Sequence, residues 1–247
     1  MPNTNKRAKM LRTAAVLILI ALIMNVAVYA MSIIVGEVQE SLVSGDFKAL
    51  FNPTDKEDFA KALANCILLP ANVADLIITL LVVIMLFALK EKKAGILFIV
   101  SACVSFVLIT ATCLIVITST TDADTVSNLT AYLIVTVIYQ ILIFLLGLLF
   151  TGAFKSKTKV AGIIIAVLFM VFALFRIVLM LLGLPDNIKE LNEYIEESGW
   201  TSYDSLVAAA DMFCGPIMFL FNIVGMIICS FAVALTSKKE KTEPEIS

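Results

Sequence analysis

Long apolar stretches with almost no charge constrain this chain more than any other feature. Six stretches, each long enough to cross a bilayer, carry at most one charged residue. A helix rises 1.5 Å per residue, so roughly 20 residues cross a hydrocarbon core of about 30 Å. We therefore expect an all-α polytopic integral membrane protein with six transmembrane helices. The expected spans are residues 13–36, 70–89, 94–119, 128–152, 160–184 and 207–236.

Composition agrees with a single membrane domain over residues 1–247. Of these residues, 61% are hydrophobic and 15% are charged, whereas a soluble domain has about 25% charged residues. Six spans with short connections leave no room for a separate soluble domain of about 100 residues. Histidine is absent, which excludes histidine-based zinc sites and Ser-His or Cys-His nucleophiles. We expect neither enzymatic activity, nor a metal, nor a cofactor, nor nucleic-acid binding.

Basic residues gather between alternate spans and so predict the orientation. They lie before the first span and after the second, fourth and sixth, whereas the other connections are mainly acidic. The positive-inside rule therefore places both termini in the cytoplasm. The first apolar stretch continues to Val35, beyond the about 7–15 residues of a signal-peptide core, so we expect an uncleaved span. Compact loops without an organelle signal favour a bacterial plasma membrane.

Two amphipathic segments are expected on the outer side. Thr54 and Glu57 form a capping box ahead of an apolar stripe, which predicts a short helix over residues 54–68 that leads into the second span. Apolar residues recur at helical spacing after Pro185 and predict a second helix over residues 186–198.

Similar sequences open the odd-numbered spans. Residues 93–96 resemble residues 159–163, and residues 13–16 occupy the same place in the first span. In the even-numbered spans, residues 74–79 resemble residues 131–136, and residues 210–213 extend the series more weakly. These similarities indicate three helical hairpins of one ancestry, related by an axis along the membrane normal. Chance similarity between apolar sequences is the alternative.

Five spans each carry a polar residue at a common depth. At 1.5 Å per residue, these residues lie roughly 20–25 Å from the basic ends of their spans. They are Asn25, Asp75, Gln140, Arg176 and Asn222. A charge within the membrane costs at least about 2.5–3.5 kcal/mol, so Arg176 should have a partner. Asp75 is the first choice and Asp211 the second, with Ser105 or Thr110 completing the layer.

This polar layer has two interpretations. As a binding site it would hold a solute, with Arg176 binding an anionic group or exchanging it for Asp75 during transport. As a structural network it would fix the register of the helices. Gly215 and Pro216 lie inside the sixth span, where proline can kink a helix, so together with Asp211 they form a possible gate.

These features favour a non-enzymatic component of membrane transport. It would be a small oligomeric permease or the membrane subunit of a larger transporter, with the lipid bilayer and further subunits as partners. The alternative is a membrane-embedded interaction protein: an assembly, immunity or signalling factor that acts through its acidic outer loops. An enzyme ranks third, because no phosphate loop, zinc motif or nucleophile turn occurs in the sequence.

Overall fold

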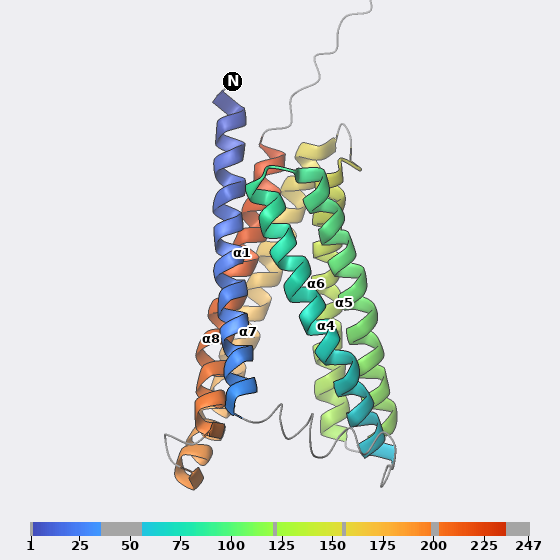
Figure 1. Cartoon of the computed structure of the whole chain (residues 1–247), viewed down its shortest axis with the longest axis vertical. Coiled ribbons are helices and arrows are strands. Elements are labelled where there is room, and N and C mark those ends of the chain that lie inside the picture. Colours follow the sequence, from blue (N-terminus) through green and yellow to red (C-terminus); the bar gives the residue numbers. More distant parts are fainter. Residues whose placement is uncertain (1, 36–55, 121–122, 155–156, 199–202, 236–247) are drawn as a thin grey trace, which may run out of the picture.

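The computed structural model describes residues 2–35, 56–120, 123–154, 157–198 and 203–235. Within these ranges the chain forms six helices and no strand, which confirms the all-helical fold (Figure 1). The helices are α1 (Pro2–Val35), α4 (Lys56–Phe87), α5 (Glu91–Ser119), α6 (Ala123–Thr151), α7 (Thr158–Ser198) and α8 (Tyr203–Ala234).

Five of these helices, all except α4, are long and apolar enough to cross a membrane. The described apolar part of α4, Asn72–Phe87, is shorter. Large hydrophobic side chains such as Ile23, Val107, Leu174 and Leu182 point outward from the bundle. A continuous apolar surface of this kind suits contact with lipid, because soluble monomers rarely expose large apolar patches. The helices are thus compatible with a multi-pass membrane protein.

Two helices run further than the sequence predicts. The expected segment 54–68 and the second span merge into α4. The fifth span and the expected outer helix 186–198 merge into α7, a single helix of 41 residues that contains Pro185. The sequence predicts a break between two helices at this proline, and that prediction is wrong because the helix continues through it. A proline removes one backbone donor, and membrane helices tolerate it when the neighbouring turns keep their own hydrogen bonds.

The helices form a ring in the order α1, α4, α5, α6, α7, α8. Helix α8 packs extensively against both α7 and α1, and these three helices make one group; α5 packs extensively against both α4 and α6, and these three make a second group. Contacts between the groups are more limited and join α1 to α4, α6 to α7 and α6 to α8. In Figure 1 the two groups lie together at the end that holds the N-terminus and diverge toward the opposite end.

Close packing is concentrated in the half of the bundle that holds the start of α1, here called the near half. The buried hydrophobic side chains of α1, α4, α6 and α8 fall within residues 11–22, 82–86, 142–150 and 223–234. In the opposite half, the far half, these four helices have no buried hydrophobic side chain among their described residues. The hydrophobic core therefore belongs to the near half.

Glycines bring helix backbones together within each group. A Cβ atom on Gly95 of α5 would lie 2.8 Å from the carbonyl oxygen of Gly147 on α6. A Cβ atom on Gly162 of α7 would lie 2.8 Å from the Cβ atom of Ala234 on α8, and Gly225 of α8 approaches α1 as closely. Small residues at such crossings allow tight packing of membrane helices. The tight glycine contacts thus join α5 to α6 and α8 to both α7 and α1, whereas α4 contains no glycine.

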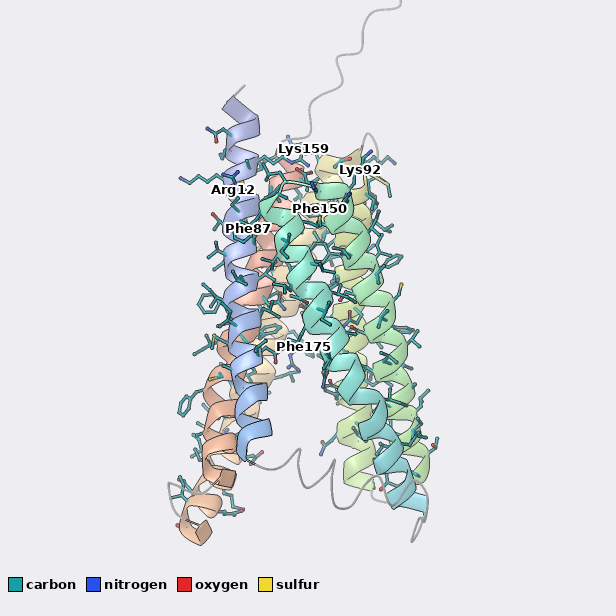
Figure 2. The ribbon with its side chains drawn as sticks, in the orientation of Figure 1. Arg12, Phe87, Lys92, Phe150, Lys159 and Phe175 are labelled. Carbon is teal, nitrogen blue, oxygen red and sulfur yellow. The ribbon has the colours of Figure 1, made fainter. Side chains whose placement is uncertain are left out.

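The near end of the bundle is basic. Arg12, Lys92 and Lys159 lie toward this end, where α1 begins and α8 ends (Figure 2). Arg7 forms an ion pair with Glu91 at the start of α5 and so links α1 to the turn between α4 and α5. The membrane orientation and the hairpin repeat stay predictions.

Candidate functional site

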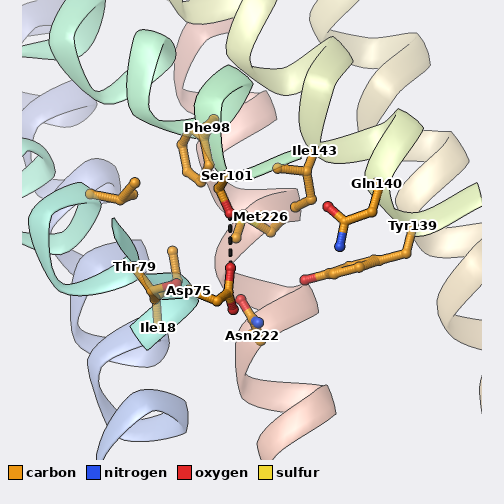
Figure 3. A pocket seen from close by; sticks show the side chains of 11 residues that line it. Ile18, Asp75, Thr79, Phe98, Ser101, Tyr139, Gln140, Ile143, Asn222 and Met226 are labelled. Atoms are coloured by element: carbon orange, nitrogen blue, oxygen red, sulfur yellow. Dashed lines mark hydrogen bonds between the residues drawn. The ribbon is translucent and has the colours of Figure 1, made fainter. Parts of the chain in front are cut away.

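A polar cavity lies where the near half meets the far half. It has a volume of about 70 Å³ and is lined by side chains from α1, α4, α5, α6 and α8 (Figure 3). Because a water molecule occupies about 30 Å³ in the liquid, this space suits a few waters or one small ion. Its polar lining comes from Asp75, Thr79, Ser101, Tyr139, Gln140 and Asn222, and its apolar lining from Ile18, Val82, Phe98, Ile143 and Met226.

Asp75 is anchored from the neighbouring helix. The Ser101 hydroxyl donates a hydrogen bond of 3.0 Å to Asp75 Oδ1, and the Ser105 hydroxyl donates one of 3.4 Å to the same oxygen. The two serines lie four residues apart on α5 and therefore share one face of that helix. The other carboxylate oxygen, Oδ2, receives no hydrogen bond from the described residues and is available to a ligand.

Asn222 contributes a second free oxygen atom from α8. Its Oδ1 is buried and has no hydrogen-bond partner among the residues that the structure describes. The side chains of Asp75, Asn222, Tyr139 and Gln140 point toward the same space (Figure 3). A buried acceptor without a partner costs about 1–3 kcal/mol, so this amide oxygen favours a bound donor or cation.

Arg176 lies outside the cavity lining. Its guanidinium carbon is 5.8 Å from the centroid of the Phe219 ring, in a cation–π contact. Phe219 meets Phe172 edge to face at 6.2 Å, and Phe172 stacks on Tyr139 at 5.7 Å. This aromatic series connects Arg176 to the wall of the cavity. The structure pairs Asp75 with serines, so the expected contact between Arg176 and Asp75 is not observed.

The cavity thus brings together three of the five predicted site residues. Asp75, Gln140 and Asn222 line it, whereas Asn25 is exposed on α1 and Arg176 packs over an aromatic ring.

Sequence reasoning missed two polar residues of the cavity and misjudged a third. Thr79 lies four residues after Asp75, so helical spacing places both on one face of α4. Tyr139 directly precedes Gln140, but it was not predicted as a site residue because aromatic residues are common in apolar spans. Ser101 was left out of the polar layer in favour of Ser105 or Thr110, although its hydroxyl donates to Asp75 at 3.0 Å.

The possible gate in the sixth span lies within an unbroken helix. Pro216 is inside α8, and a Cβ atom added to Gly215 would meet nothing within 4 Å. The side chain of Asp211 lies outside the described residues. Gly215 is therefore not required for close packing.

The oxygen-rich lining determines which chemistry the cavity suits. It offers one carboxylate, three hydroxyl groups and two amide groups. Among the described residues, no three histidine, cysteine, aspartate or glutamate side chains gather as metal ligands. The cavity therefore resembles a binding site for one small polar or singly charged species.

Comparisons with known proteins identify no relative. No family model, no curated protein and no solved structure matches this chain. The cavity and the helices around it are therefore what indicate a function.

Proposed function

We propose that this protein is a non-enzymatic transport component of the plasma membrane, and that its pathway passes through the cavity at Asp75. The observation that carries the proposal is a carboxylate within an apolar helix bundle. A charged side chain at this depth costs at least about 2.5–3.5 kcal/mol, and such residues commonly mark substrate or ion pathways. Helices from both groups form the site, and this arrangement favours a role in transport over a purely structural network.

The position of the cavity supports alternating access. Asp75 belongs to the α4–α5–α6 group, and Asn222 belongs to the α7–α8–α1 group. Many transporters bind substrate between two helix bundles and expose it to either side when one bundle rocks against the other. Here α5 packs extensively against α4 and α6, α8 packs extensively against α7 and α1, and more limited contacts join the two groups.

The basic near end predicts how the protein and its pathway are oriented in the membrane. The positive-inside rule assigns that end to the cytoplasm, so the diverging far half faces the outside. In this arrangement α4 is the sixth crossing, since it lies in the ring between α1 and α5. The bundle would act either as an oligomeric permease or with further transporter subunits in a bacterial membrane.

Reconstitution into liposomes tests the proposal directly. Purified protein is exposed to sodium or proton gradients, with and without a panel of small solutes, while solid-supported membrane electrophysiology records the currents. Wild-type protein should give a solute- or ion-dependent current, and Asp75→Asn should reduce it at least roughly tenfold. The matched control is Asp186→Asn, which removes an exposed carboxylate of α7 and should leave the current unchanged.

Two results would overturn transport as the function. One is a wild-type current that Asp75→Asn does not reduce. The other is the absence of any current from folded protein that co-purifies with a stoichiometric protein partner held by the acidic outer segments. The second result would favour the interaction protein.

A further inference from the structure

The charge on Asp75 requires a partner that the described residues do not supply. Its carboxylate is bound by two neutral serine hydroxyls, and Arg176 lies over Phe219. No lysine or arginine forms an ion pair with Asp75 in the described part of the chain. An unpaired carboxylate within a membrane bundle is unstable unless a bound cation or a proton neutralises it.

The remaining ligands in the cavity favour a metal cation over a proton. A proton on Asp75 Oδ2 requires one acceptor only, whereas oxygens from four helices converge on the cavity. The buried Oδ1 of Asn222 is an acceptor to which no described residue donates, and the Tyr139 and Thr79 hydroxyls supply further oxygens. Hard cations prefer carboxylate, carbonyl and hydroxyl oxygens of this kind.

The number of carboxylates determines the charge of the cation. Ca²⁺ sites usually combine several carboxylate and carbonyl oxygens, and Mg²⁺ keeps several waters in an octahedral shell. Asp75 is the one carboxylate in the cavity lining, and the volume of about 70 Å³ leaves little room for a hydrated divalent ion. A single negative charge is balanced by a monovalent cation.

On the basis of the proposed transport function, we propose that the cavity binds one monovalent metal cation. The cation lies between Asp75 Oδ2 and Asn222 Oδ1, and Na⁺ is the probe that tests for it. These ligands belong to α4 and α8, so the cation bridges the two helix groups. Occupancy would hold the groups together at this level, and release would free them to move. The cation site would thus couple ion binding to the change between the two transport states.

Equilibrium binding of ²²Na⁺ to purified protein in detergent tests the site without any transport step. Choline chloride keeps the ionic strength constant. Wild-type protein should bind about one Na⁺ per chain, and Asp75→Asn should lose this binding. Asn222→Leu removes the amide oxygen at similar volume and should weaken binding roughly tenfold. It also serves as the second variant if Asp75→Asn does not fold.

Thr110→Val is the matched control. Thr110 Oγ1 is also buried without a partner in the described part of the chain, but it does not line the cavity. This variant should bind Na⁺ as the wild type does. Loss of binding in Thr110→Val comparable to the loss in Asn222→Leu would contradict a localised site.

The outcomes separate the cation site from the transport function. Folded wild-type protein that binds no Na⁺, or Asn222→Leu protein that binds as tightly as wild type, overturns the cation site. Currents driven by a proton gradient in protein that binds no Na⁺ leave the transport function standing and reject the site. Specific Na⁺ binding in protein that carries no current supports the site and rejects transport.

Discussion

At the residue scale, α4 and α6 end in the same left-handed backbone conformation but carry different residues there. Leu89 has φ 55° and Gly152 has φ 82°, and each follows the last turn of its helix. The amides of Leu89 and Lys90 bond to the carbonyls of Leu86 and Met85, and the end of α6 has the equivalent bonds. Both ends are Schellman motifs, which favour glycine at the left-handed position. α4 therefore has a leucine where glycine is preferred.

Leu89→Gly should stabilise the protein. A left-handed conformation costs a non-glycine residue about 1–2 kcal/mol, and Leu89 is exposed and loses little packing. We expect a gain of about 1 kcal/mol in the free energy of unfolding, measured by equilibrium unfolding in mixed micelles. Gly152→Ala is the opposite test and should lose about 1 kcal/mol. Equal stability of both variants and the wild type would mean that these turns do not limit unfolding.

Thr110 and Thr112 provide a second matched pair. Thr110 Oγ1 is buried with no partner among the described residues, whereas the Thr112 hydroxyl donates to the Leu108 carbonyl at 2.9 Å. Thr110→Val should raise the free energy of unfolding by about 1 kcal/mol, because it removes an unsatisfied polar atom of similar volume. Thr112→Val should not raise it. A gain for Thr112→Val equal to that for Thr110→Val would reject the assigned difference in hydrogen bonding.

At the element scale, glycines allow close contacts between particular pairs of helices. Gly95 and Gly147 place the backbones of α5 and α6 in contact, and Gly162 and Gly225 do the same for α8 with its two neighbours. Among the glycines that the structure describes, none makes a tight contact from one group to the other. This pattern predicts rigid groups and a more compliant boundary between them.

Gly95→Ala should destabilise the bundle. The new Cβ atom would lie 2.7 Å from the Phe150 Cβ atom and 2.8 Å from the Gly147 carbonyl, so the helices must separate. Overpacking of this kind costs about 1–3 kcal/mol. Gly183→Ala is the control, since nothing lies within 4 Å of its added Cβ atom, and it should gain about 0.5–1 kcal/mol. Equal unfolding midpoints for the two variants would contradict the close α5–α6 crossing.

Gly215→Ala tests whether α8 bends during transport. The added methyl group meets open space, so the fold should be unaffected or stabilised by about 0.5–1 kcal/mol. If Gly215 and Pro216 form the gate, the stiffer helix should lower the proteoliposome current while ²²Na⁺ affinity stays unchanged. A current equal to that of the wild type would exclude bending at Gly215 as a requirement.

At the scale of the whole molecule, the sequence predicts the helices well and their arrangement poorly. Uncharged stretches identify each helix, because hydrocarbon demands long apolar segments. The neighbours of α1 could not be predicted, because its lipid-facing and protein-facing surfaces are both apolar. The glycine that brings α1 close to α8 belongs to α8, so the sequence of α1 gives no sign of this contact. The continuous α7 was missed because proline usually ends helices in water.

The same limits apply to the site. Asp75 and Asn222 stand out in the sequence because polar residues are rare in apolar spans. Depth counted along each helix predicts a common level but not which way a side chain points, so Asn25 and Arg176 were grouped with residues that they do not join. The aromatic partner of Arg176 could not be predicted, because it depends on how α7 and α8 pack.

The central claim is that the proposed transport pathway passes through the cavity at Asp75, reached from the diverging far half, and thiol labelling tests it most directly. Thr79→Cys and Val83→Cys are compared in protein whose five native cysteines are replaced and that elutes as a single species. Thr79 lines the cavity, and Val83 lies one turn deeper in the near half, 2% exposed. A membrane-impermeant thiol reagent should modify Thr79→Cys from the side opposite the termini and leave Val83→Cys unmodified. Protection of Thr79→Cys from that side, or equal labelling of both positions, would contradict the account.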